Sequence, residues 1–93
     1  MFSRTMKQMR ESIRLRKYIV TLHAAEEMND DGFSIFDVEH CILHGEIIER
    51  QKEKSIAEWK YLVHGVTFKE RGLCVVTKTS VTEKLVIITV FAL

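Results

Sequence analysis

The spacing of apolar residues changes once along this 93-residue chain, close to Gly45. Before that point, apolar residues recur every three or four positions, which is the period of a helix with one buried face. After it, apolar and polar residues alternate or gather in short apolar runs, which is typical of β-strands. Helices followed by strands predict an α+β domain in which the helices pack on one face of the sheet.

Short motifs mark the ends of the expected helices. Thr21 is a suitable N-cap, because its side-chain oxygen accepts hydrogen bonds from first-turn amides. Ser34 and Asp37 have the spacing of a capping box, in which each side chain bonds the other residue's backbone. Gly32 supplies the left-handed conformation of a helix end, and Gly45 ends the next helix. We therefore expect helices at about residues 4–16, 22–29 and 35–44.

Four strands are expected after Gly45, at about residues 47–51, 58–64, 73–78 and 85–91, with polar turns at 52–55, 69–72 and near 82–83. The last strand is apolar on both faces, which predicts a central place in the sheet or cover on both sides. Short connections favour a four-stranded, mainly antiparallel meander. Alternation divides the second strand between two faces, with Trp59, Tyr61 and Val63 on one and Glu58, Lys60, Leu62 and His64 on the other.

A chain of this length has room for one core, so residues 1–93 are expected to form a single domain. Its net charge of +1 argues against indiscriminate nucleic-acid binding. The charges are nevertheless segregated. Residues 1–17, a basic helix or lead-in, hold six basic residues and one acid, whereas residues 18–49 hold eight acids and neither Lys nor Arg. This pattern permits a basic face opposite an acidic one, or acidic helices paired with the basic ends of the chain.

Several features predict a cytoplasmic protein. The two cysteines, Cys41 and Cys74, lie in apolar surroundings without metal-ligand spacing, as expected of buried thiols in a reducing compartment, although a disulfide between them is an alternative. The basic N-terminal region lacks the apolar stretch of a secretory signal. No apolar run approaches the length needed to cross a bilayer, so we expect no membrane association.

An ordered set of motifs runs through residues 18–91 and resembles a bacterial family, domain of unknown function four-two-five-eight: Thr21-x-His23-Ala24-x-x-x-Met28, Ser34-x-x-Asp37-Val38, Gly45-x-Ile47-Ile48, Tyr61-x-Val63-x-Gly65, Val75-Val76 and Ile88-Thr89-Val90. The family looks like a distant relative of RelE-type and MqsR-type toxin ribonucleases. The resemblance therefore implies a RelE-like architecture, metal-independent RNA cleavage and pairing with a small zinc-finger-type antitoxin. Many members carry arginine in place of Glu27 or Asp31, whereas this chain has acids at both positions.

RNA cleavage without a metal needs groups that move protons and cations that stabilise the phosphate. His23 and His64 are the candidates for proton transfer, because the pKa of free histidine lies near neutral pH. Lys60 is the candidate for stabilising charge on the phosphate. Arg71 and Lys78 are predicted to bind RNA phosphates, and Tyr61 or Trp59 to stack on a base if exposed.

Structural roles compete with each of these assignments. Lys60, His64 and Lys78 are equally expected of a solvated sheet face, and His23 with Glu27 of a helix start that satisfies its own hydrogen bonds. His40 and His44 have helical metal-chelating spacing but no recognisable third ligand, so neither metal nor other cofactor is expected. The alternative function is a non-catalytic protein-binding module or homodimer that docks through its basic first helix and acidic helical face.

Overall fold

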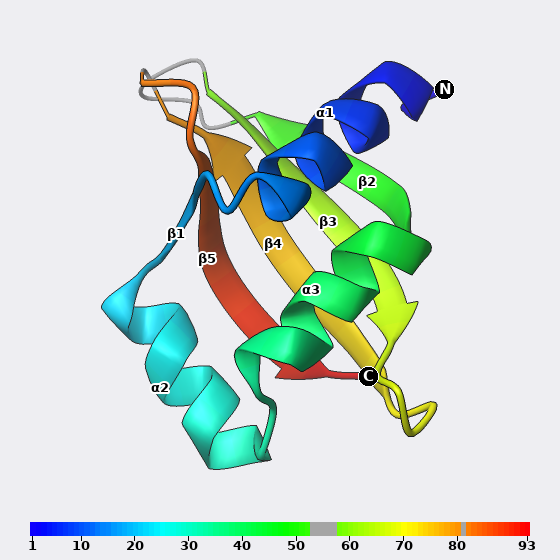
Figure 1. Ribbon diagram of the computed structural model, residues 1–93, viewed down its shortest axis with the longest axis vertical. Helices are drawn as coiled ribbons and strands as arrows, with labels where there is room; N and C mark the ends of the chain where they lie inside the picture. The colour runs from blue at the N-terminus through cyan, green and yellow to red at the C-terminus, as the bar shows by residue number, and fades with distance from the viewer. Residues whose placement is uncertain (53–57, 81) are drawn as a thin grey trace.

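The computed structural model describes residues 1–52, 58–80 and 82–93, and shows helices gathered against a twisted sheet (Figure 1). The elements follow in the order α1 (Ser3–Arg14), β1 (Tyr18–Val20), α2 (Leu22–Asp31), α3 (Ile35–His44), β2 (Glu46–Lys52), β3 (Trp59–Val66), β4 (Gly72–Thr79) and β5 (Leu85–Ala92). The α+β prediction is thus confirmed. Of the turn predicted at 52–55, residues 53–55 lie outside the described residues.

The sheet has five strands in the order β1-β5-β4-β3-β2, rather than the four that were expected. Strands β2 to β5 form the predicted antiparallel meander. The additional strand, β1, pairs in parallel with β5, where Ile19 is opposite Val86. With only three residues and a partner more than sixty positions away, β1 has too short a pattern to be recognised in the sequence. Its pairing makes β5 a central strand, as its apolar composition predicted.

The predicted helix boundaries are supported by the observed caps. The Thr21 side chain accepts a hydrogen bond from the amide of Ala24, and Gly32 ends α2 with a φ of 71°. Both hydrogen bonds of the Ser34–Asp37 capping box are present, and α3 ends at His44. No helix in the described part of the chain combines the length and apolar character needed to cross a membrane.

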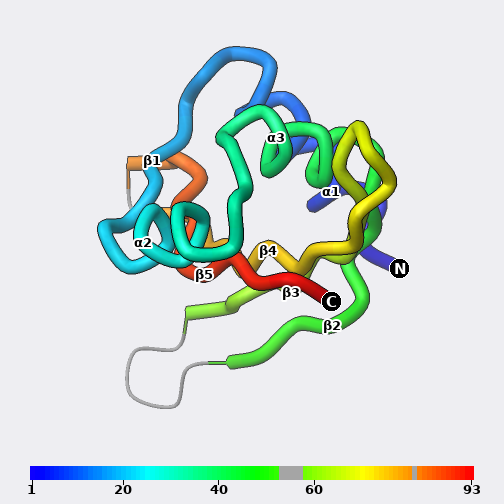
Figure 2. The backbone as a smooth tube through the Cα atoms, turned by 90° about the horizontal axis from the view of Figure 1, so that it is seen from below, coloured from blue at the N-terminus to red at the C-terminus, as the bar shows by residue number. Residues whose placement is uncertain are grey.

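Helices α1 and α3 cover one face of the sheet, and α2 lies beside β5 (Figure 2). The core between these layers includes Met6, Met9 and Ile13 of α1, all nearly inaccessible to solvent. Burial of such a side chain stabilises a fold by about 1.5–3 kcal/mol. The basic N-terminal segment is therefore an integral helix of the domain, and not a lead-in.

The end of α3 packs against β3 with almost no space between them. A Cβ atom on Gly45 would lie 2.4 Å from the carbonyl oxygens of both Cys41 and His64. A Cβ atom on Gly65 would lie 2.9 Å from Cys41 Sγ. Arg10 also braces this corner, because its Nη2 donates to the Gly45 carbonyl at 2.9 Å. The absence of side chains at the two glycines allows the helix to pack this closely on the sheet.

We predict that Gly45→Ala lowers the free energy of unfolding by at least about 2 kcal/mol, because two backbone oxygens must move to admit the methyl group. Gly72→Ala is the matched control, since its Cβ would meet Leu93 Cβ at an ordinary 3.4 Å. Urea unfolding followed by circular dichroism measures both changes. Equal effects for the two variants would contradict this account of the corner.

Candidate functional site

The face of the sheet that points away from α1 and α3 is called here the open face. Along β3, Val63 is fully buried in the core and Tyr61 packs against it, so the residues alternating with them point to the open face. The same alternation applies to β4, where Leu73 and Val75 belong to the core. The polar side chains that this pattern and the strand register place on the open face are Glu46, Glu49, Gln51, Lys60, His64, Lys78 and Thr89.

Three of the predicted site residues share the open face. His64 lies between Glu46 of β2 and Cys74 of β4 in the register, so a carboxylate is directly opposite the imidazole. Tyr61 is paired with Thr77 in the antiparallel register. Their neighbours Lys60 and Lys78 therefore lie side by side on adjacent strands. Lys60 and His64 are roughly 13 Å apart along β3. The face thus has a histidine–carboxylate end and a lysine end.

Acidic residues accompany the lysines. Lys78 Nζ lies 3.3 Å from Glu58 Oε2, and both side chains are about one-third exposed. Glu49 is opposite Leu62, between the histidine end and the lysine end. The open face is therefore of mixed charge. Such a face can bind a phosphate at the lysine end, where two ammonium groups lie on adjacent strands.

Tyr61 lies on the other side of the sheet from Lys60 and His64. Its ring is half-buried, packs against the core and meets the Phe2 ring edge-on, with centroids 6.1 Å apart. Trp59, two residues earlier on the same side, is more accessible. Arg50 lies over its ring at 4.2 Å. Of the two aromatic candidates for stacking, the structure leaves Trp59 exposed and packs Tyr61 inward.

Arg71 lies far from the lysines, before the start of β4, whereas Lys78 is close to the end of this strand. Their separation along β4 is roughly 20 Å. The Arg71 side chain reaches the helices instead, donating to the carbonyl oxygen of Asp31 and stacking 4.1 Å over the Phe33 ring. Arg71 ties the β3–β4 hairpin to the loop between α2 and α3, and does not extend the lysine pair.

His23 is separated from His64, because α2 packs beside β5 and strands β5 and β4 lie between them (Figure 1). His23 is 67% exposed and its Nε2 is 3.2 Å from Glu27 Oε1. The same oxygen accepts a hydrogen bond from the backbone N–H of Val90 at 3.1 Å. Glu27 thus accepts a hydrogen bond from a backbone N–H of β5 that lies beyond the three residues paired with β1. The structure does not bring the two predicted catalytic histidines together.

His40 and His44 form a third histidine group, with ring centroids 4.6 Å apart. His40 Nδ1 is 2.7 Å from the Val66 carbonyl oxygen, and its ring lies against Phe68. Within residues 1–52, 58–80 and 82–93, no three His, Cys, Asp or Glu side chains form a group able to hold a metal.

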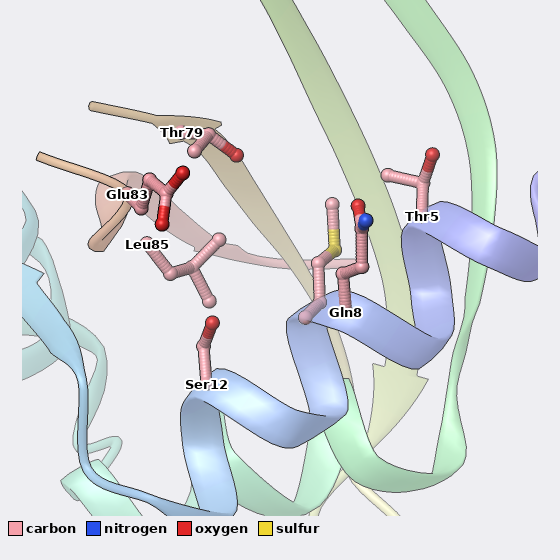
Figure 3. A pocket seen from close by; sticks show the side chains of 7 residues that line it. Thr5, Gln8, Ser12, Thr79, Glu83 and Leu85 are labelled. Carbon is pink, nitrogen blue, oxygen red and sulfur yellow. The ribbon is translucent and has the colours of Figure 1, made fainter. Parts of the chain in front are cut away.

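Two pockets lie away from the open face. One, of about 310 Å³, is between α1 and the end of β4, where Thr5, Gln8 and Ser12 point toward Thr79 and Glu83 (Figure 3). The second, of about 430 Å³, lies between α1 and the start of β2 and is lined by Phe2, Met6, Arg10 and Ile47, among others. Neither pocket is lined by His23, Lys60, His64 or Lys78.

Both cysteines are free, buried thiols. Burial raises the pKa of Cys41 to about 12, and Cys74 nearby adds to the effect. Burial also raises the pKa of Cys74 to about 11. Because both thiols are free, the structure does not contain the alternative disulfide. The raised pKa values make both thiols poor nucleophiles, even though Cys74 lies beside His64.

Together these features define an α+β domain with helices on one face of a mixed sheet and a polar site on the other. The family model described as Domain of unknown function (DUF4258) matches residues 20–92, so the chain belongs to this family. The match confirms the family expected from the ordered motifs. Comparison with curated proteins and with solved structures finds no match.

We predict that Glu27→Ala destabilises the fold by about 1–2 kcal/mol, because it leaves the Val90 N–H without its carboxylate acceptor. The neighbouring Glu26→Ala, at an exposed position, should change stability by less than about 0.5 kcal/mol. Denaturant unfolding of both variants checks this difference. A Glu27→Ala variant as stable as wild type would show that β5 does not depend on this hydrogen bond.

We also predict that neither thiol reacts readily with Ellman's reagent at pH 8 in the folded protein. A pKa of about 11 or 12 leaves fewer than about one thiol in a thousand ionised at that pH. Reaction should accelerate by at least about a hundredfold in guanidinium chloride, where the pKa returns to that of a free thiol. Fast reaction of one equivalent under native conditions would contradict the burial of one of the two thiols. The Cys74→Ser variant would show which cysteine reacts.

Proposed function

We propose that this protein is a toxin-like endoribonuclease that binds RNA on the open face of its sheet. The observation that supports this most directly is that Lys60, Lys78 and His64 share this face, with Glu46 opposite the histidine. A histidine base with a carboxylate at the opposite position of the neighbouring strand, and a separate pair of cations, are groups that phosphodiester cleavage can use.

The chemistry begins with the 2′-hydroxyl of the RNA. His64 accepts its proton as the general base. The 2′-oxygen bonds to phosphorus and the bond from phosphorus to the 5′-oxygen breaks, which leaves a 2′,3′-cyclic phosphate. The leaving oxygen takes a proton from water, and the imidazolium of His64 returns its proton to the resulting hydroxide. Lys60 and Lys78 bind phosphate oxygens along the strand. Because His23 is beyond β5, we assign proton transfer to His64 and leave His23 out of the reaction.

The setting of this activity is the cytoplasm of a bacterium, where a toxin is held inactive by a partner. This role follows the RelE-type likeness expected from the sequence motifs, and a small zinc-finger-type antitoxin is the partner proposed. Covering the open face would block RNA and inhibit the enzyme in one step.

A protein-binding module is the second candidate, supported by apolar side chains on the same face. Ile19, Val66 and Phe91 are each between 38% and 45% exposed there, around the buried Val86 and Cys74. Exposed apolar groups of this kind are found where a partner or a second copy docks. In this case the polar residues form the rim of an interface, and no catalysis occurs.

The two functions are separated by following RNA cleavage by the purified protein in the presence of EDTA, together with growth after induction in a bacterial host. We expect wild type to cleave RNA and arrest growth. His64→Ala should lose at least about a hundredfold in rate, the scale of general base catalysis. Lys60→Ala/Lys78→Ala should lose at least about tenfold, because two phosphate contacts are removed.

Lys69→Ala and His23→Ala are the matched controls, since both side chains are exposed and lie away from the open face. Their cleavage rates should equal that of wild type. An inactive wild type that forms a dimer or a defined complex, measured by light scattering, would establish the binding module instead. Loss of cleavage in His23→Ala alone would move the catalytic site to α2.

A further inference from the structure

Aromatic rings and cations gather on the helix-covered side of β2 and β3. The start of α1 lies beside β2 (Figures 1 and 2). The Arg50 guanidinium carbon is 4.2 Å from the centre of the Trp59 ring and 5.9 Å from that of Phe2. Lys52 Nζ is 5.7 Å from the Trp59 ring. We call Phe2, Arg50, Lys52 and Trp59 the cation–aromatic corner.

This concentration of contacts exceeds what ordinary surface packing provides. Significant cation–π contacts occur about once per 70–80 residues in proteins. Among the described residues of this chain, three of the four such contacts are in this one corner. Arg50, Lys52 and Trp59 are all exposed, so the stack contributes little to the core. Parts of the Trp59 ring and of both cations therefore remain accessible to solvent.

The corner has the composition that single-stranded nucleic acids recognise. Bases stack on aromatic rings and on guanidinium planes, while lysine and arginine contact the backbone phosphates. Phe2 also lines the pocket of about 430 Å³ beside α1, which gives space next to the rings. A folded double helix presents no unstacked base to such a surface, so the chemistry favours a single strand.

The corner and the lysine end of the open face lie on opposite sides of the same strand pair. Lys52 is paired with Trp59, and the next pair joins Gln51 to Lys60. Strand β2 is at the edge of the sheet, so no further strand separates the two sides. A flexible backbone can therefore pass around this edge and contact both.

We propose that single-stranded RNA stacks a base on the cation–aromatic corner and passes around edge strand β2 to the lysine end of the open face. This inference rests on the proposed function, because it takes the same RNA as the ligand. It makes Arg50 and Trp59 substrate-positioning residues, remote from the reacting phosphate. The β2 edge then selects unpaired RNA.

Trp59 is the only tryptophan of the chain, so its fluorescence reports on this corner alone. We would titrate the wild type with an unstructured 12-nucleotide 2′-O-methyl RNA, which has no 2′-hydroxyl to cleave, and follow both tryptophan emission and the anisotropy of a dye on the RNA. Binding should change Trp59 emission. Arg50→Ala should weaken binding about tenfold, as expected for loss of a stacked contact, and lower the salt dependence of log K by about 0.7.

Arg50→Lys keeps the charge and removes the planar guanidinium, so its affinity should fall between those of Arg50→Ala and wild type. Lys69→Ala, at the β3–β4 hairpin, is the matched control and should bind as wild type does. Circular dichroism of each variant verifies that it is folded.

Unchanged Trp59 emission upon RNA binding, or wild-type affinity in Arg50→Ala, would overturn the inference. If Lys60→Ala/Lys78→Ala still weakened binding in that case, the proposed function would stand without it. Stacking at the corner by a protein that cleaves no RNA would support the inference and overturn the nuclease. Equal emission changes and affinity with a poly-glutamate peptide would assign the corner to a protein partner and overturn RNA stacking.

Discussion

The close packing of α3 on β3 is the constraint on which the rest of the structure depends. Cys41 fits against Gly65, and its Sγ lies 3.8 Å from the Val63 carbonyl oxygen and 3.9 Å from that of Leu73. At the next turn, Gly45 leaves the helix with carbonyl oxygens on both sides. Any side chain there would separate the layers and cost packing energy throughout the core. The same contact holds the backbone of His64 in place, so the position of the candidate site is set from behind the sheet.

This packing places α1 and α3 on a single face and leaves the other to residues of mixed character. Open antiparallel sheets commonly have one solvated face, where polar and apolar residues alternate across strands. Here the polar residues are unevenly distributed. A histidine and a carboxylate occupy one end and two lysines the other, with Glu49 and Leu62 between them. Both proposed functions use this face, because RNA needs its charged ends and a protein partner needs its exposed apolar residues.

The helices and the meander could be predicted from the sequence because local motifs specify them. The capping box at Ser34 and the left-handed Gly32 depend on residues a few positions away. Strand β1 was missed because its parallel pairing with β5 depends on distant residues. Alternation correctly placed Lys60 and His64 on one face, but it could not show that Arg71 turns toward Phe33 or that Tyr61 packs inward.

Strand β2 shows how one local irregularity distributes charge between the two faces. Ile47 faces the core, and simple alternation would place Glu49 and Gln51 on the same side with it. The register shift between Ile47 and Glu49 reverses this order. Glu49 and Gln51 consequently join Glu46 on the open face, while Arg50 and Lys52 turn toward Trp59. The bulge thus separates the acids near His64 from the cations at the corner. It also interrupts the exposed edge, which discourages pairing with another strand. The edge is therefore better suited to contacts through its side chains, such as those proposed for RNA, than to extension of the sheet.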